Sequence, residues 1–510
     1  MNRCSYTSSR QAYFTAACCC SVEPQAELEK VLKVPWHIQS GMFAVYPAQT
    51  VSRMRVMGLS SNKLVISWII ITAVIFFLMA RFFVNRTAIL QLPLERSLAV
   101  EYTEWPEFTT KTRYTMEWYR NNCFSKDLED VEEIFNNLIP QWSQSDLEGC
   151  KDAYRQFDLM YKINIRFSPK LTFPGSFGYK VRRWLGNDSD LLRKVHNQEL
   201  IYVYHPLTSE HVMYNTLRSS RPMPGPPVNL YEWVDKQSEE TRQNCDFCRP
   251  LESTAMDVLG RNKKKHTVRV SNTFRLDRWH TMVIPYKQHH PLNFTLPTFL
   301  ALFDECWNVA KDMQAIDVDY IYPNLVWDSL YQGGVSQLHP HVHIMMVPDR
   351  YYGFLEHLRT SGQQYFDAEG DNYFSTLLEI HEALGLTIHY GNSVAFPTFV
   401  GKSDMEVMFL SESPGEDFYR LIFYTVNAYH DTFVQLCKGF AAAYPAVGNS
   451  QRARLGRIPV VARLISRGDC VSPRVDYTTC EIFQQTYRSH DPWQVARAIR
   501  EAVKKYDGRE

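Results

Sequence analysis

The stretch from His339 to His343, with the sequence His-Pro-His-Val-His, is the feature that most restricts the fold of this chain. Alternate residues of a β-strand lie on the same face, so a strand here would place three imidazoles on one side of a sheet. The apolar run from Ile344 to Val347 continues the segment, as expected for a strand that enters a buried sheet. This pattern favours the floor of a pocket. A solvated strand is the alternative, but it would rarely hold three of the 16 histidines.

The chain is long enough for two or three domains and carries no net charge. It has 510 residues, of which 45% are hydrophobic, and its 55 basic residues balance 55 acidic ones. Such a composition supplies a core but no overall field that would attract nucleic acid, so we expect no nucleic-acid partner. An anionic substrate would have to be held locally. Twelve cysteines are too few for a small disulfide-dense scaffold.

An uncharged run near the N-terminus predicts a membrane span. Leu64 to Ala80 contains no charged residue, and as a helix it would extend about 26 Å. We therefore expect a transmembrane helix over residues 63–84, preceded by a tail without fixed structure over residues 1–62, and a single-pass membrane protein. A fully buried core helix is the alternative. A cleavable signal peptide fits less well, because the run begins far from the first residue.

The orientation of this predicted span is not decided by charge, because basic residues stand on both sides of it. The triplets Asn187-Asp-Ser and Asn293-Phe-Thr match glycosylation acceptors and favour a lumenal catalytic part, in the endoplasmic reticulum or Golgi. The cysteines from Cys18 to Cys20 would be palmitoylated on a cytosolic tail, or would be inert thiols.

After the predicted span the chain divides into three stretches. Residues 87–243 mix aromatic and charged residues and form a lead-in region of unknown role, which ends near a proline-rich segment. Residues 244–350 contain the histidine motif. Residues 377–510 repeat the order of elements more loosely, which predicts a second, related half without that motif.

In residues 244–350, alternation and apolar runs predict four strands and one helix. The strands are expected at His266–Val270, Thr281–Ile284, Tyr320–Val326 and Leu338–Val347. The helix is expected from Leu296 to Met313, where Thr295 is suited to cap its start. Antiparallel strands with one long crossing helix form an α+β unit. The second half is expected to hold a strand at Glu406–Leu410, a helix at Asp417–Tyr444, a strand at Pro459–Ser466 and a helix at Trp493–Tyr506.

Three motifs together resemble a known superfamily. The run Gly333-Gly-x-Ser336-x-x-His339-x-His341-x-His343 resembles the signature of the histidine-triad (HIT) nucleotide hydrolases and transferases. Pro340, within that run, resembles the galactose-1-phosphate uridylyltransferase branch. The segment His280-Thr-Met-Val-Ile-Pro285 and the pair Cys245-Asp-Phe-Cys248 resemble the upstream strand and the cysteine pair of its zinc-containing members. The resemblance implies a HIT-like α+β fold, with antiparallel sheets and crossing helices in two pseudo-repeats.

The residues of the motif suit phosphoryl chemistry. A neutral imidazole at His341 is a good nucleophile toward phosphorus, and its attack would form a covalent nucleotidyl-histidine. His343, two residues later, could protonate the leaving group. Ser336 and the amides of Gly333 and Gly334 would bind phosphate oxygens. The resemblance supports the roles of His341 and Ser336.

Two further residues are candidate substrate ligands, and three positions depart from the uridylyltransferase pattern. Asp328 stands where the resemblance implies an Asn, and His280 opens the upstream strand motif. His343 stands where that branch has Gln, so transfer and hydrolysis both remain open. Trp279 stands where a Gly is usual, which would narrow the pocket.

Two thiols and two imidazoles predict a structural zinc site. Cys245, Cys248 and His339, with His289 or His290, supply the number and type of ligands of a closed tetrahedral site, and we take His289 as the fourth. The zinc would tie the cysteine pair to the histidine strand without touching substrate. A disulfide or two free thiols are the alternatives.

Two classes of function follow. The first is a nucleotidyl transferase or hydrolase that acts through His341 on a nucleoside diphosphate sugar or a related phosphoanhydride. The second is a membrane-anchored nucleotide-binding protein that keeps the fold without turnover, as Asp328 and Trp279 would allow. The uridylyltransferases that the chain resembles form pairs of subunits, so a homodimer is a further expectation.

Overall fold

The computed structural model describes Thr72 and residues 105–124, 128–220, 228–448, 456–471 and 485–508. All of these except Thr72 belong to one unit, Val100–Glu510. The predicted tail over residues 1–62 lies outside the described residues, as does the predicted membrane helix over residues 63–84 apart from Thr72.

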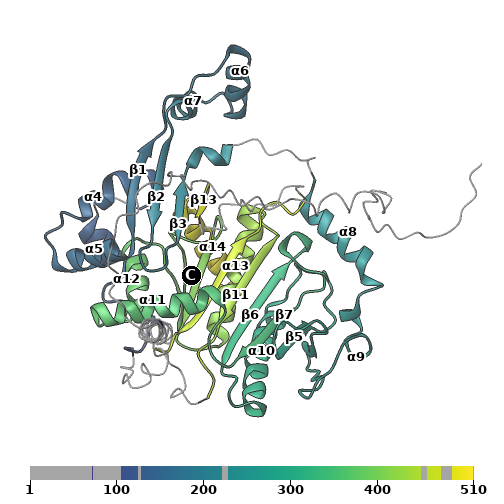
Figure 1. Ribbon diagram of the computed structural model, residues 1–510. Coiled ribbons are helices and arrows are strands. Elements are labelled where there is room, and N and C mark those ends of the chain that lie inside the picture. The colour runs from purple at the N-terminus through teal and green to yellow at the C-terminus, as the bar shows by residue number, and fades with distance from the viewer. Residues whose placement is uncertain are drawn as a thin grey trace, which may run out of the picture. The chain divides into compact units, whose positions relative to one another are not determined.

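A nine-stranded antiparallel sheet forms the centre of this unit (Figure 1). Its strands pair in the spatial order β4-β5-β7-β6-β11-β12-β10-β9-β8. They are β4 (Thr267–Ser271), β5 (Trp279–Pro285), β6 (Tyr322–Ser329), β7 (Val342–Val347), β8 (Ile388–Tyr390), β9 (Ser393–Pro397), β10 (Val407–Ser411), β11 (Lys438–Ala443) and β12 (Val460–Ser466).

The sheet consists of two halves with the same connections. In the first half two strands, a helix and two strands follow as β4, β5, α10 (Leu296–Ile316), β6 and β7; in the second half they follow as β9, β10, α13 (Glu416–Phe433), β11 and β12. The spatial orders β4-β5-β7-β6 and β9-β10-β12-β11 correspond, and the halves join where β6 pairs with β11. The structure is therefore mixed α and β with antiparallel sheets.

The remaining elements surround this sheet. A second sheet has the order β1-β2-β3-β13, with β13 parallel to β3. Its strands are β1 (Lys162–Phe167), β2 (Glu199–Tyr204), β3 (His211–Tyr214) and β13 (Gln485–Arg488). The other helices and helical turns are α2 (Met116–Cys123), α3 (Val131–Glu133), η2 (Ile134–Leu138), α4 (Ile139–Trp142), α5 (Glu148–Met160), α6 (Gly175–Trp184), α7 (Ser189–His196), η3 (Thr216–Ser220), α8 (Leu230–Arg242), η4 (Asp246–Cys248), α9 (Pro250–Ser253), η5 (Tyr331–Gly333), α11 (Gly353–Glu369), α12 (Tyr373–Ala383) and α14 (Pro492–Asp507).

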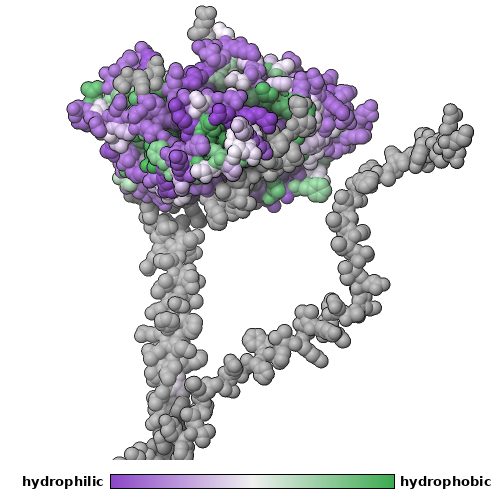
Figure 2. All heavy atoms as spheres, turned by 90° about the horizontal axis from the view of Figure 1, so that it is seen from above, coloured by the Kyte–Doolittle hydropathy of each residue, from purple (hydrophilic) through white to green (hydrophobic). Residues whose placement is uncertain are grey.

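One face of the large sheet is covered by helices and carries the core. The rings of Phe299 and Phe303 on α10 pack against Trp327 of β6, and all three side chains are buried. Burying side chains of this size supplies much of the hydrophobic stabilisation. Figure 2 shows one face of the molecular surface, where hydrophilic residues predominate and hydrophobic residues form small patches.

The opposite face of the sheet carries His343, one of the candidate site residues. His343 of β7 and Arg463 of β12 belong to one row of directly paired residues that runs across the sheet through β6 and β11. Residues directly opposite each other on neighbouring strands point to the same face. His343 and Arg463 therefore face the same side, away from Trp327.

This face is covered over the second half by the chain itself. Arg463 binds both carboxylate oxygens of Glu210, at 2.8 and 3.2 Å, and its guanidinium lies 4.5 Å from the centre of the Phe354 ring on α11. His357, also on α11, lies 3.1 Å from the carbonyl oxygen of Thr208. The segment that precedes the histidine-bearing half therefore fills the face beside Arg463.

The expected single-pass membrane location is contradicted. Within the described part of the chain, no helix has both the length and the apolar character needed to cross a membrane. The longest helix there, α10, has 21 residues, but Asp304, Glu305, Lys311 and Asp312 give it four charged side chains. Charged groups at that density are costly in hydrocarbon.

The long helix predicted from Asp417 to Tyr444 is wrong in its last third. α13 ends at Phe433, and Val434 takes the left-handed conformation with φ 53°. The residues that follow form β11, which pairs on both sides, with β6 and with β12. A short apolar run such as this one fits a helix or a buried strand equally well, and the neighbouring strands decided between them.

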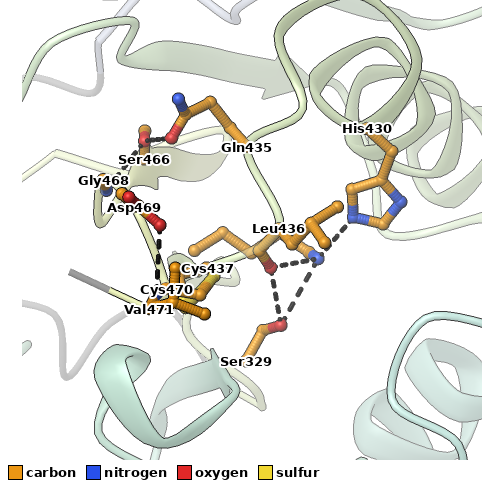
Figure 3. Close-up of a disulfide and its surroundings, with 11 residues drawn as sticks. Ser329, His430, Gln435, Leu436, Cys437, Ser466, Gly468, Asp469, Cys470 and Val471 are labelled. Atoms are coloured by element: carbon orange, nitrogen blue, oxygen red, sulfur yellow. Dashed lines mark hydrogen bonds between the residues drawn. A yellow bond between two sulfur atoms is a disulfide. The ribbon is translucent and has the colours of Figure 1, made fainter. Parts of the chain in front are cut away.

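A disulfide supports the loop that carries Ser336. Cys437, just before β11, is bonded to Cys470 after β12 (Figure 3). The pair packs in a small apolar cluster with Leu330 and Leu338, which stand at the two ends of that loop. The cluster therefore holds the loop against the second half of the sheet.

Candidate active site and metal site

A cavity of about 370 Å³ lies on the face that carries His343. Its lining includes five of the predicted site residues, namely Asp328, Gly334, Ser336, His341 and His343. They come from β6, from the loop between β6 and β7, and from the start of β7. The fold thus brings together residues predicted to bind and attack a phosphate.

The three histidines of the motif do not act as one array. β7 begins at Val342, so His339 precedes the regular strand, and its ring turns toward the cysteine pair. The rings of His341 and His343 line the cavity, with their centres 4.8 Å apart. Pro340, which lacks the N–H needed for regular pairing, stands at this change of direction.

The tautomer of His341 follows from one contact. Its Nδ1 atom lies 2.9 Å from the carbonyl oxygen of His339. A carbonyl oxygen only accepts hydrogen bonds, so Nδ1 carries the hydrogen and Nε2 keeps its lone pair. Burial lowers the pKa of His341, which keeps the ring neutral near pH 7. The imidazole is therefore held in the neutral form with its lone pair on Nε2, the form that a nucleophile requires.

His343 presents the opposite tautomer. The amide N–H of Leu276 donates to Nδ1 of His280 at 3.1 Å, so the hydrogen of His280 sits on Nε2. That Nε2 lies 2.9 Å from Nδ1 of His343, which must accept. The hydrogen of His343 is then on Nε2. Burial first, and then His341 and His280, lower the pKa of His343 to about 3.

His280 stands behind His343 rather than at the cavity. It is only 1% exposed and is not part of the cavity lining. Burial first, and then Arg275, lower its pKa to about 4. The geometry places His280 where it orients His343, whereas the sequence had indicated a direct contact with substrate.

The loop glycines use their amides within the loop. Gly333 N–H donates to the carbonyl of Leu330 and Gly334 N–H to that of Tyr331, both at 3.0 Å. These amides therefore do not point at the cavity, contrary to the expected phosphate contacts. Gly334 has φ 112°, a conformation that side chains rarely adopt. The glycines shape the turn, and Ser336 lines the cavity.

Asp328 lies beside an arginine from the second half. A side chain at Gly439 would approach Asp328 Oδ1 to 3.4 Å and Arg467 Nε to 3.1 Å, so both groups lie over this glycine. Burial raises the pKa of Asp328, and Arg467 opposes that rise. The positive charge beside it offsets the repulsion that Asp328 would exert on a phosphate. Arg467 was not among the predicted site residues.

The four predicted metal ligands form one cluster. Ligand atoms of Cys245, Cys248, His289 and His339 all lie within 4.8 Å of one another. Cys248 Sγ is 3.3 Å from His289 Nδ1 and 3.6 Å from His339 Nδ1. Burial first, and then Cys248, raise the pKa of the Cys245 thiol to about 12, so a thiolate here requires a cation. A metal ion fits this set of donors.

The contacts of the Nε2 atoms of His289 and His339 agree with a metal site at this cluster. His289 Nε2 lies 2.8 Å from the carbonyl oxygen of Ser238, and His339 Nε2 lies 3.1 Å from that of Pro285. Both Nε2 atoms therefore carry hydrogen, and both Nδ1 atoms offer lone pairs to the cluster. His290 instead contacts Asp235 at 2.8 Å, which leaves His289 as the ligand.

Sequence reasoning missed several residues that line the cavity. Asp246 and Phe247 lie between the two cysteines of the cluster, and Asn272 and Phe274 follow β4. The Cys-x-x-Cys motif draws attention to its ends and gives no sign that its middle residues face the same cavity as His341. Trp279, by contrast, points away and donates to Asp317. It does not narrow the cavity.

Comparison with known proteins gives only weak likenesses. No family model and no curated protein matches the chain. An ADP-glucose phosphorylase from Arabidopsis thaliana, solved with bound ADP-glucose, is 14% identical with a TM-score of 0.44, over 59% of this chain and 98% of that one. A uridylyltransferase is 12% identical with a TM-score of 0.41, over 60% and 99%.

The yeast Ap4A phosphorylase Apa2 is a third similar structure, 13% identical with a TM-score of 0.26, over 58% of this chain and 87% of that one. Likenesses at these scores identify neither a substrate nor a reaction for this chain. The function proposed below therefore rests on the geometry of the site.

Proposed function

We propose that the protein transfers a nucleotidyl group from a nucleoside diphosphate sugar, or a related phosphoanhydride, through a covalent intermediate on His341. The observation that carries this proposal is the pair of opposite tautomers. His341 offers a lone pair and His343 an N–H group to one cavity, because each ring has its Nδ1 atom fixed by a separate partner. Attack by His341 and hydrogen bonding of His343 to the leaving group then need no prior rearrangement of either ring.

In the first step, Nε2 of His341 attacks the α-phosphorus of the substrate. The N–P bond forms, the bond from phosphorus to the bridging oxygen breaks, and the leaving phosphate departs as an anion whose oxygen accepts a hydrogen bond from the Nε2–H group of His343. The modified His341 ring becomes cationic, and its Nδ1–H donates to the carbonyl of His339, which stabilises that charge. Ser336 would donate its hydroxyl hydrogen to a nonbridging oxygen.

In the second step, an acceptor oxygen attacks the same phosphorus and the N–P bond breaks. A phosphate or sugar phosphate attacks as an anion and gives up no proton, whereas the proton of an attacking water passes to solvent. The acceptor is water in hydrolysis and a phosphate or sugar phosphate in transfer. Both outcomes use the same residues, so the acceptor decides the reaction.

The metal would be a structural Zn²⁺, held by Cys245, Cys248, His289 and His339. Two thiolates and two imidazoles form a closed tetrahedral set that leaves no position for substrate. The ion would hold the cysteine turn against the segment that leads to His341.

A trapping experiment tests the proposal. Purified protein is incubated with an α-³²P-labelled nucleotide sugar and quenched in alkali, in which phosphohistidine survives, and the labelled peptide is identified by mass spectrometry. We expect acid-labile label on His341 and none in His341→Ala, with turnover reduced by about three orders of magnitude. His290→Ala, which changes a histidine outside the cavity and the cluster, is the matched control.

Label elsewhere, or turnover retained in His341→Ala, would contradict the proposal. Tight binding of nucleotide without label or turnover would instead support the second function, a nucleotide-binding protein that does not catalyse.

A further inference from the structure

The turn between the two metal-binding cysteines is also a wall of the reaction cavity. Phe247 and Asp246 lie between Cys245 and Cys248, and both line the cavity together with His341. The Phe247 ring meets the His341 ring edge to face, with centres 5.0 Å apart and planes at 68°. The two predicted sites therefore share one structural element.

The same turn also contacts the loop that carries Ser336. Asp246 Oδ2 accepts a hydrogen bond from Gln337 Nε2 at 3.4 Å, and Gln337 directly follows Ser336. Phe247 packs against His341 on one side of the cavity, and Asp246 contacts the loop on another. A shift of the turn would therefore displace both the His341 ring and the loop that carries Ser336.

Contacts on two sides hold the His341 ring. The hydrogen bond from Nδ1 to the carbonyl of His339 holds one edge, but a ring can still swing about a single hydrogen bond. Phe247 is only 8% exposed and fills the space beside the ring. Its edge-to-face contact limits the swing, so Nε2 stays directed at the cavity.

The position of Phe247 depends in turn on its neighbouring cysteines. η4 is a single short helical turn, and Cys245 and Cys248 at its ends contact His339 at 3.6 Å. A bound metal would replace these weak sulfur contacts by coordination bonds and so fix the turn. Phe247 also belongs to a small apolar cluster with Val268, Val270, Met282 and Ile284, so the metal would add to the packing that already holds the turn.

We propose that metal occupancy of the four-residue cluster controls the reactivity of His341, and that Phe247 transmits this control. The inference rests on the proposed function, in which His341 is the nucleophile. Phe247 is a positioning residue, because it acts through the His341 ring. The metal is then a regulator of the site as well as a structural element.

The test measures the reactivity of His341 directly. Diethyl pyrocarbonate transfers a carbethoxy group to an unprotonated imidazole nitrogen, and the rate at His341 is followed by peptide mass spectrometry. We expect chelation of the metal to raise this rate in the wild type about fivefold or more, since the ring becomes mobile and less shielded. Phe247→Ala should show the raised rate with metal bound, and chelation should not raise it further.

Matched variants separate this effect from general loosening. Phe247→Leu keeps most of the apolar volume and should fall between the wild type and Phe247→Ala. Phe167→Ala changes a phenylalanine that is 61% exposed on β1 and should leave the His341 rate unchanged. Metal content, measured on each sample, should stay the same in all three variants. With substrate, Phe247→Ala should lose about tenfold in kcat with little change in KM.

Two results would overturn the inference: an unchanged His341 rate in metal-loaded Phe247→Ala, or an equal response of that variant and the wild type to chelation. His381, which is fully buried, reports unfolding. If chelation exposes it, the metal-loaded comparison of Phe247→Ala with the wild type decides alone. Absence of nucleotide label on His341 would overturn the proposed function but not the coupling, because the modification rate needs no turnover.

Discussion

The Nε2 atom of His280 lies 2.9 Å from the Nδ1 atom of His343, and this contact determines which nitrogen His343 presents to the cavity. The hydrogen on His280 is fixed in turn by the backbone amide of Leu276. A residue with no access to substrate thereby sets the protonation of one that lines the cavity.

Removing the His280 side chain should weaken the hydrogen bond from His343 to the leaving group. His280→Ala frees Nδ1 of His343 to take the hydrogen, so we expect kcat to fall about 10- to 100-fold. His343→Ala should cost at least as much. The double variant should be no worse than His343→Ala alone, because the two residues act in series. Steady-state kinetics of the four proteins measure this, and additive losses would show that His280 acts by another route.

Loss of one thiol should empty the metal site. Cys248→Ser leaves three strong ligands, and we expect less than about a tenth of the metal content and a melting temperature lower by about 5 °C or more. Elemental analysis and thermal unfolding give both values. Cys306→Ser is the control, because this buried free cysteine lies outside the cluster. Full metal content in Cys248→Ser would remove Cys248 from the ligand set.

Acid should destabilise the protein through His381. This residue is fully buried, and burial lowers its pKa to about 3, while the unfolded chain takes up a proton near pH 6.5. Above pH 6.5 this residue therefore leaves the free energy of unfolding unchanged. As the pH drops from 6.5 toward 3, the free energy of unfolding falls by up to about 1.4 kcal/mol for each pH unit.

Urea unfolding of the wild type and His381→Phe at pH 7.5, 6.5 and 5.5 tests this sign. The ring of His381 already packs against the rings of Phe396 and Phe399, so a phenylalanine should be accommodated. Below pH 6.5 the free energy of unfolding of the variant should fall less steeply with pH than that of the wild type. The difference in slope should correspond to about one bound proton. Equal dependence in the two proteins would mean that His381 titrates normally when folded.

A side chain at Gly334 should strain the loop beside the cavity. Its φ of 112° is unfavourable for any residue with a Cβ atom, so Gly334→Ala should cost about 1–2 kcal/mol or shift the loop. We expect kcat/KM to fall about tenfold because Ser336 moves with it. Gly415→Ala is the control: its φ is 175°, and no atom lies within 4 Å of the added carbon. Equal effects in both variants would contradict the role of φ.

Much of the α+β pattern could be read from the residues. The helix predicted from Leu296 begins at that residue, and Thr295 caps it, because capping chemistry acts over three residues and is visible locally. The helix predicted through Tyr444 failed because β11 is a strand only by virtue of β6 and β12 beside it. The expected membrane location rested on local apolarity alone, and no helix among the described residues supports it.

In the candidate site, too, some features could be predicted from the sequence and others depend on the tertiary structure. The donor types needed for a metal and for attack on phosphorus were apparent from the motifs around Cys245 and His341, since chemical type is a property of each residue. Only the tertiary structure decided that His289 rather than His290 turns to the cysteines, which nitrogen of His341 and His343 carries hydrogen, and that Phe247 joins the two sites. Those outcomes depend on backbone carbonyls, amides and rings that distant segments bring within a few ångströms, and a linear pattern does not contain such distances.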